Sequence, residues 1–210
     1  VEDPVEYDLP GISQTQINLR AGMTFARGLK AILRQDPDVI LIGEIRDRET
    51  AEIATQSSLT GHLVLSTLHT NTAAGAITRL QDLGVDSFLL ASTIRGILSQ
   101  RLLRKLCQSC RNAIQPNEFN RNLLKLRDGE TIYEATGCAK CNSTGYSGRQ
   151  ALFELVTVDA HLQTLIHENA GELELEASFR TKGPSIRDAG FSMVRSGHTT
   201  IEEVLRVTSV

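Results

Sequence analysis

The sequence predicts an α/β domain followed by a small metal-binding module and a helical segment. In the first half, short apolar runs alternate with amphipathic, helix-like segments, as in doubly wound α/β domains. Two Cys-x-x-Cys pairs then bracket a polar stretch, and leucines at helical spacing follow them. We therefore expect an α/β core over residues 1–103, a tetracysteine module over 104–148 and a helical subdomain over 149–210.

The composition is that of a globular protein. The 210 residues are 40% hydrophobic, which supplies enough apolar surface for an ordinary core. A net charge of −3 gives no general electrostatic case for binding nucleic acid. The sequence lacks an apolar run of the roughly 18 residues that a membrane-spanning helix needs, and its start lacks the basic and apolar regions of a signal peptide. We expect neither nucleic-acid binding nor insertion into a membrane.

The first element after the start is a helix. Residues 1–19 are acidic and interrupted by prolines, which indicates a strand end and a loop. Over residues 24–35, apolar residues recur at helical spacing while Arg27 and Arg34 fall on another face. This pattern predicts an amphipathic helix with a basic stripe.

Two strands with a helix between them come next. Residues 39–42 are continuously apolar and β-branched, which is typical of a strand buried on both faces of a parallel sheet. A helix should cover residues 48–59, with Gly61 near its C-cap, and a second strand should cover 62–68. The carboxyl ends of such strands form the edge at which open α/β sheets bind phosphates.

The remaining elements are predicted as helices. Capping residues favour one helix from Asn71 or Thr72 to about Leu83 and another from Asp86 or Ser87 through Leu103. Beyond the cysteines, helical spacing predicts three more helices, which involve residues 155–166, 173–179 and 201–207.

The four cysteines of the chain have the spacing of a structural zinc site. The pairs are Cys107 with Cys110 and Cys138 with Cys141. Two such pairs place four thiolates around one tetrahedral Zn²⁺. Disulfides, incidental buried thiols and redox Cys-x-x-Cys pairs are the alternatives, but neither pair opens a helix after a strand as redox pairs do. The sequence therefore predicts a zinc module.

Glu44 is the first candidate catalytic residue. It follows the strand 39–42 and Gly43, at the place where ATPases carry an acid that polarises the attacking water or orients Mg²⁺. A solvated acid at a strand end is the alternative. The matching phosphate loop, Gly-x-x-x-x-Gly-Lys-Ser/Thr, is not found in these 210 residues.

Two histidines flank the second strand. His62 and His69 are seven residues apart, and an odd separation puts two side chains on opposite faces or ends of a strand, so we do not expect a shared metal. His69, at the carboxyl end, is placed to sense a γ-phosphate. For His62, a structural role with satisfied hydrogen bonds is the alternative to a functional one.

Two further groups of charged residues are candidates for phosphate or metal chemistry. Three arginines at intervals of seven could contact phosphates or form a solvated face: Arg20, Arg27 and Arg34. Three acids near the start could be plain loop residues or a metal-proximal cluster: Glu2, Asp3 and Glu6.

Together these motifs make the chain resemble the secretion ATPases of type II secretion and type IV pili, most closely the general secretion pathway E protein family. The matching segments are an Asp box (1–7 with 14–20), an arginine-bearing helix (25–38), a Walker B end (43–47) and a His box (60–71). The resemblance covers the whole chain.

The resemblance implies a RecA-like P-loop NTPase core that is truncated and lacks its P-loop. It makes Glu44 the Walker B acid and Glu2 and Glu6 candidate water- or Mg²⁺-organising acids, with His69 acting beside them. The residues that it implies for nucleotide or phosphate binding are His62, His69, Arg20, Arg27, Arg34 and Arg46.

The resemblance also implies a biological setting. The intact protein would hydrolyse ATP with Mg²⁺ as a homo-hexamer on the cytoplasmic face of the bacterial inner membrane, held there by secretion platform proteins, and would drive pseudopilus assembly. The zinc module favours an assembly motor over a retraction motor. A type IV pilus extension ATPase and a non-catalytic docking module for the platform protein are the alternative functions.

The absent phosphate loop is the main departure from the family pattern. The resemblance places that loop and the N-terminal domains upstream of Val1. We therefore expect the isolated chain to bind ATP weakly or not at all and to be inactive alone. We also expect an exposed sheet edge beside the strand 39–42.

Overall fold

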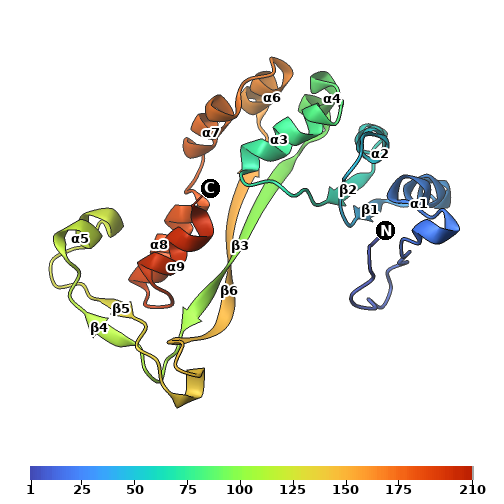
Figure 1. The fold of residues 1–210 in the computed structure, drawn as a ribbon. Coiled ribbons are helices and arrows are strands. Elements are labelled where there is room, and N and C mark those ends of the chain that lie inside the picture. Colours follow the sequence, from blue (N-terminus) through green and yellow to red (C-terminus); the bar gives the residue numbers. More distant parts are fainter. Residues whose placement is uncertain (210) are drawn as a thin grey trace. The chain divides into compact units, whose positions relative to one another are not determined.

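A computed structural model of the chain describes residues 1–209 and shows two compact units. The first unit comprises residues 1–97 and 157–179, and the second comprises residues 98–156 and the segment from Arg180 onward. Figure 1 labels their helices and strands. The division into three domains predicted from the sequence stays a prediction.

The first unit begins with the predicted strand-helix-strand arrangement. Two short 3₁₀ helices, η1 (Leu19–Ala21) and η2 (Leu33–Gln35), flank helix α1 (Phe25–Ile32). Strand β1 (Val39–Ile42) and strand β2 (Leu63–Ser66) pair in parallel, joined by helix α2 (Arg48–Leu59). The parallel pair therefore has the helical crossover that this topology requires, and it confirms the α/β class.

Side-chain caps explain where these helices begin. The hydroxyl of Thr24 accepts a hydrogen bond from the Arg27 amide at the start of α1. Asp47 does the same for the Thr50 amide at the start of α2. Each cap satisfies an amide that the first turn of a helix leaves unpaired.

Only one face of the β1–β2 pair is buried within the described chain. Ile40 and Ile42 pack with Phe25 and Leu29 of α1 and with Ala54 of α2, so both helices cover the same face. The opposite face carries apolar side chains that are 46–57% exposed: Val39, Leu41, Leu63 and Leu65. The prediction that β1 is buried on both faces is therefore wrong for residues 1–209.

The outer edge of β1 is partly paired. The nitrogen of Val1 donates to the Leu41 carbonyl at 2.7 Å, and the Gly43 amide donates to the Val1 carbonyl at 2.7 Å. The expected open edge is thus covered at its carboxyl end, and this contact brings the acidic residues after Val1 toward Gly43.

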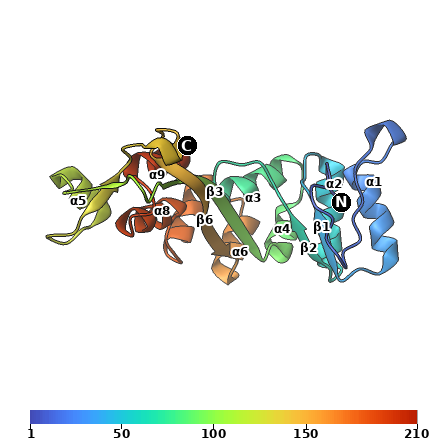
Figure 2. The ribbon, with the colours of Figure 1, turned by 90° about the horizontal axis from the view of Figure 1, so that it is seen from below.

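Four helices complete the first unit. They are α3 (Ala73–Asp82), α4 (Ser87–Thr93), α6 (Ala160–His167) and α7 (Glu172–Arg180). Arg180, the last residue of α7, belongs to the second unit. Helix α4 packs against α6, and the rings of Phe88 and His167 meet edge to face with centroids 6.1 Å apart. A distant segment of the chain therefore returns to the α3–α4 region, as both views show (Figures 1 and 2).

The predicted helix from Asp86 or Ser87 through Leu103 is wrong in its second half. Helix α4 ends at Thr93, and residues Gly96–Leu106 form strand β3, which pairs with strand β6 (Tyr146–Thr157). The helix expected over residues 155–166 is confirmed only where it coincides with α6, because Leu155 lies in strand β6. The apolar spacing fits both a helix and a strand, and pairing with a partner far along the chain decides between them.

The second unit packs a small module and two helices around these long strands. Strand β4 (Asn112–Ile114) pairs antiparallel with β5 (Ile132–Glu134), and the remaining elements are α5 (Glu118–Leu124), η3 (Ala139–Cys141), α8 (Ile186–Arg195) and α9 (Ile201–Thr208). Its buried core combines residues from most of these elements: Leu103, Leu124, Ile132, Leu152, Phe191, Val194, Ile201 and Val204. Helix α8, which begins with a Ser185–Asp188 capping box, was not predicted.

A buried carboxylate links α9 to β3. The Glu203 side chain is 0% exposed and accepts hydrogen bonds from the Arg104 amide at 2.8 Å and from the guanidinium groups of Arg104 and Arg206 at 2.8 and 2.6 Å. Arg104 also lies 4.2 Å from the centroid of the Tyr146 ring. Burial opposes ionisation of Glu203, but these hydrogen bonds outweigh it and lower its pKa from 4.5 to about 2.

Glu203 should make the stability of this unit acid-sensitive. Its folded pKa lies below its unfolded pKa, so its contribution is present above pH 4.5 and is lost as the pH falls toward about 2. We expect Glu203→Gln to lower the free energy of unfolding by up to about 3 kcal/mol at pH 7. Urea unfolding at pH 7, 5 and 3 should show the difference from wild type shrinking below pH 4.5. Exposed Glu202→Gln is the control, and a pH-independent difference would contradict the assignment.

Candidate functional site

The loops after β1 and β2 meet at the carboxyl ends of the two strands. The Thr67 hydroxyl donates to the Gly43 carbonyl at 2.5 Å, and the Ile45 amide donates to the Thr67 carbonyl at 3.1 Å. Glu44 follows β1, and His69 follows β2. The parallel register therefore gathers the two sequence-predicted residues at one edge of the sheet.

Glu44 and His69 are in direct contact. Glu44 Oε2 lies 3.3 Å from His69 Nε2, and Glu44 Oε1 accepts a hydrogen bond from Arg46 Nη2 at 2.6 Å. The hydrogen bond from Arg46 lowers the pKa of the Glu44 carboxyl below its usual value. The Glu44 side chain is only 14% exposed, whereas that of His69 is 88% exposed. An ionised carboxylate thus sits behind an imidazole that is open to an incoming ligand.

A second acid, Asp3, joins this group. The sequence places Asp3 in an acidic cluster with Glu2 and Glu6, but the resemblance gave a catalytic role only to Glu2 and Glu6. Asp3 Oδ2 lies 3.8 Å from Arg46 Nη1. Glu2 instead accepts a hydrogen bond from the Gln14 amide group at 2.7 Å, and Glu6 is an exposed loop residue. The acidic run indicated the region, but only the Val1 contact with β1 decides which acid faces Arg46.

His62 lies at the opposite end of β2 from His69. Its Nδ1 is 2.9 Å from the Ser57 carbonyl and 3.2 Å from the Thr60 hydroxyl. These contacts close the turn between α2 and β2. The structure therefore separates the two histidines, and it gives His62 the structural surroundings that the sequence left as an alternative.

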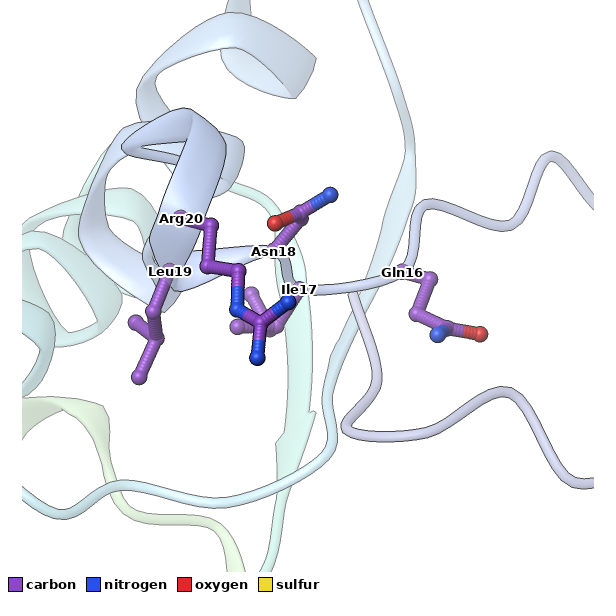
Figure 3. A pocket seen from close by; sticks show the side chains of 5 residues that line it. All are labelled: Gln16, Ile17, Asn18, Leu19 and Arg20. Atoms are coloured by element: carbon purple, nitrogen blue, oxygen red, sulfur yellow. The ribbon is translucent and has the colours of Figure 1, made fainter.

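The three spaced arginines are exposed and lie on separate elements. Arg20 is in η1 and lines a pocket of about 450 Å³ with the residues Gln16, Ile17, Asn18 and Leu19 (Figure 3). Arg27 is in α1, where it donates to the Gly22 carbonyl at 3.2 Å, and Arg34 is in η2. Within residues 1–209, Glu44 forms its ion pairs with Arg46 and His69 rather than with these three.

A second pocket, of about 330 Å³, adjoins His69. It is lined by the residues that follow His69, by residues along the whole of α3 and by one residue of α7: Thr70, Asn71, Thr72, Gly75, Thr78, Arg79, Asp82 and Glu172. No local pattern in the sequence points to Glu172, because its partner Thr72 lies 100 residues earlier in the chain.

The four cysteines form one cluster. Their Sγ atoms all lie within 4.8 Å of one another, and the individual separations include 4.0 Å for Cys107 to Cys138, 3.8 Å for Cys110 to Cys141 and 3.9 Å for Cys138 to Cys141. Four sulfurs in a tetrahedron around a Zn²⁺ at about 2.3 Å are about 3.8 Å apart. The cysteines are free thiols rather than disulfides. The cluster therefore has the size that a tetrahedral metal site requires.

The polar surroundings of the sulfurs also suit metal binding. The amides of Cys138 and Gly145 each approach the Cys141 sulfur at 3.2 Å. Burial opposes ionisation of the Cys141 thiol, but these amides outweigh it and lower its pKa to about 6. Burial raises the pKa of the Cys110 thiol to about 11, so a cation is needed for all four to be thiolates.

Comparison with known proteins then identifies the family. The sequence profile described as "Type II/IV secretion system protein" matches residues 1–206. The chain belongs to the type II/IV secretion system protein family. The α/β arrangement, the Glu44–His69 pair and the cysteine cluster are thus features of a member of this family.

Two curated relatives show where in the family the chain lies. It is 57% identical to the type II secretion system ATPase E of Vibrio cholerae and 57% identical to the type II secretion system protein E of Pseudomonas aeruginosa, each over 210 residues and 99% of this chain. The chain spans about two fifths of the length of these relatives, 42% in each case.

A solved structure supports the same fold. The crystal structure of the pilus retraction motor PilT with bound ADP resembles this chain with a TM-score of 0.69 and 28% sequence identity. The match covers 100% of this chain and 51% of the PilT chain. Among residues 1–209 the structure contains no helix that is both long and apolar enough to cross a membrane.

Proposed function

We propose that this chain supplies the hydrolytic and sensing half of the ATP site of a type II secretion ATPase. The observation that carries the proposal is the meeting of Glu44 and His69 at the carboxyl ends of β1 and β2. Support comes from the relatives, since one of the two type II secretion proteins at 57% identity is itself called an ATPase. ATP, bound with Mg²⁺, supplies the phosphoryl group.

Each residue of the Glu44 group has a distinct task in this proposal. Glu44 is an ionised hydrogen-bond acceptor, which suits it to orient a water molecule or a metal-bound water for in-line attack. Arg46 fixes the carboxylate through its 2.6 Å hydrogen bond, and Asp3 holds Arg46 from the other side. His69 presents its exposed ring to the γ-phosphate.

The rest of the site must come from other elements. These 210 residues lack the phosphate loop that cradles β- and γ-phosphates with backbone amides and a lysine. We infer that the exposed guanidinium groups of Arg20, Arg27 and Arg34 contact the nucleotide between domains or between subunits. A planar guanidinium suits this task because it can bind two phosphate oxygens at once. Glu2 and Glu6 remain candidate acids of the same half-site.

The cysteine cluster has a structural role in this proposal. Zn²⁺ held by Cys107, Cys110, Cys138 and Cys141 would be four-coordinate, with no open position for a substrate. Next to it, Arg111 stacks on Tyr133 at 4.4 Å and donates to the Gly197 carbonyl at 2.6 Å. The metal would therefore fix the module against the turn between α8 and α9.

The assembly and its setting are also proposals. We place the intact protein in a homo-hexamer with a RecA-like core, on the cytoplasmic face of the inner membrane, where platform proteins recruit it for pseudopilus assembly. The relatives named for type II secretion favour this over a type IV pilus extension motor. The Glu44–His69 geometry favours a motor over a non-catalytic docking module.

Replacing Glu44 tests the proposed function. In the intact protein, Glu44→Gln keeps the side-chain volume but removes the charge that orients water. It should lower kcat for ATP hydrolysis by about 10²–10⁴-fold while assembly and nucleotide binding persist. Glu49→Gln, an exposed exchange on α2, is the control. Unchanged hydrolysis by Glu44→Gln would reject the assignment.

Metal analysis tests the zinc proposal. The purified protein should contain about one Zn²⁺ per chain, and Cys141→Ser should lose it and unfold at lower denaturant concentration. Exposed Ser147→Ala in the same module should keep both metal and stability. A wild-type protein prepared without chelator that contains no zinc would contradict the proposal.

Calorimetry on the isolated chain tests the division of the ATP site. Because the phosphate loop normally provides most phosphate contacts, residues 1–210 alone should bind Mg²⁺-ATP weakly or not at all and should not hydrolyse it. An affinity equal to that of the intact protein would show that this half-site is sufficient.

A further inference from the structure

Helix α7 contacts the segment that carries His69. Glu172, the first residue of α7, accepts a hydrogen bond from the hydroxyl of Thr72. The same hydroxyl accepts a hydrogen bond from the Gly75 amide at 2.9 Å, which makes Thr72 the N-cap of α3. Both residues belong to the first unit. One side chain therefore caps α3 and joins it to α7.

The space around this contact is small, and a side chain at Gly75 would crowd it. A Cβ at Gly75 would lie 2.9 Å from Thr72 Oγ1 and 3.2 Å from Glu172 Oε1. The carboxylate thus approaches the first turn of α3 closely, where the helix dipole and the unpaired amides favour a negative charge. The hydrogen bond itself lies at the surface, and its geometry brings the start of α7 against the first turn of α3.

A second set of hydrogen bonds holds the start of α7 in place. Asn169, in the turn before α7, accepts hydrogen bonds from the Ser87 hydroxyl and from Gln81 Nε2, the latter at 3.3 Å. Helix α6 packs against α4 on the same side. Glu172 is therefore presented to Thr72 from a turn that is itself attached to α3 and α4.

The segment between His69 and Thr72 is short and internally bonded. The Thr70 hydroxyl donates to the Thr72 carbonyl at 3.0 Å. At one end of this segment His69 meets Glu44, and at the other end Thr72 meets Glu172. The contact with Glu44 and the contact with α7 therefore lie at the two ends of one short segment.

We propose that Glu172 is a positioning residue for the hydrolytic site. It fixes the His69–Thr72 segment through Thr72, and it couples the helical pair α6–α7 to the geometry of His69 and Glu44. This inference rests on the proposed function, because it assigns Glu172 a part in the same reaction. Glu172 does not touch the reacting atoms in this proposal.

Kinetics of variants of the intact protein test the role of Glu172. Glu172→Ala should lower kcat for ATP hydrolysis about three- to tenfold and change KM for ATP less than about twofold, since a misplaced His69 affects the chemical step more than binding. Glu174→Ala, which removes an exposed acid two residues further along α7, is the matched control and should behave as wild type.

Variants of Thr72 separate positioning from simple loss of stability. Thr72→Ser keeps the hydroxyl and should retain a kcat near that of wild type. Thr72→Val removes the hydroxyl and should lower kcat as Glu172→Ala does. Thr72→Val should lower kcat less in the Glu172→Ala background than in the wild-type background, because the two side chains act through one contact. Thermal unfolding of each variant shows whether the variant is folded at the assay temperature. Expressing kcat per molecule that binds nucleotide then excludes partial unfolding as the cause of a lower kcat.

The outcomes distinguish this inference from the proposed function. If Glu44→Gln abolishes hydrolysis but Glu172→Ala matches Glu174→Ala, the role of Glu172 is rejected and the proposed function stands. If Glu44→Gln leaves hydrolysis unchanged, the proposed function fails first. Fully additive effects of Thr72→Val and Glu172→Ala would also reject the positioning role.

Discussion

The parallel pairing of β1 with β2 is the constraint on which the candidate site depends. The register sets Ile42 beside Ser66, so the chain leaves both strands at the same edge of the sheet. Glu44 and His69 follow within a few residues and can meet only because of this alignment. A slip of one residue would turn the buried residues of β1 outward and expose Ile40 and Ile42. Burial of those two side chains against α1 and α2 therefore also fixes the geometry of the candidate site.

The second unit combines an apolar core with polar interactions. Its buried apolar residues come from both long strands, the small module and helices α8 and α9, and the unit also contains the cysteine cluster and the buried Glu203 network. Small domains commonly gain stability from a structural metal, and the zinc site that we propose would act in this way. The Glu203 carboxylate makes the unit sensitive to acid, because its hydrogen bonds depend on its ionised form.

Local signals in the sequence sufficed for much of the first unit. A continuous apolar run located β1, Gly61 marked the region where α2 ends, and cysteine spacing located the cysteine cluster. What the sequence could not show depends on partners far along the chain. β3 became a strand because β6 pairs with it, and Asp3 reached Arg46 because Val1 lies beside β1. The open face of β1 likewise depends on where the covering helices lie, which apolar composition alone does not reveal.

The ion pair of Glu44 with His69 cannot by itself hold the histidine in place. The His69 side chain is 88% exposed, and exposed ion pairs contribute little because water screens the charges and two side chains lose freedom. The backbone must therefore do the positioning. On one side of His69, Thr67 bonds to Gly43 and ties the segment to β1. On the other side, Thr72 is both the cap of α3 and the partner of Glu172. Because the backbone is held on both sides of His69, its exposed imidazole can keep a defined distance from the nearly buried carboxylate of Glu44.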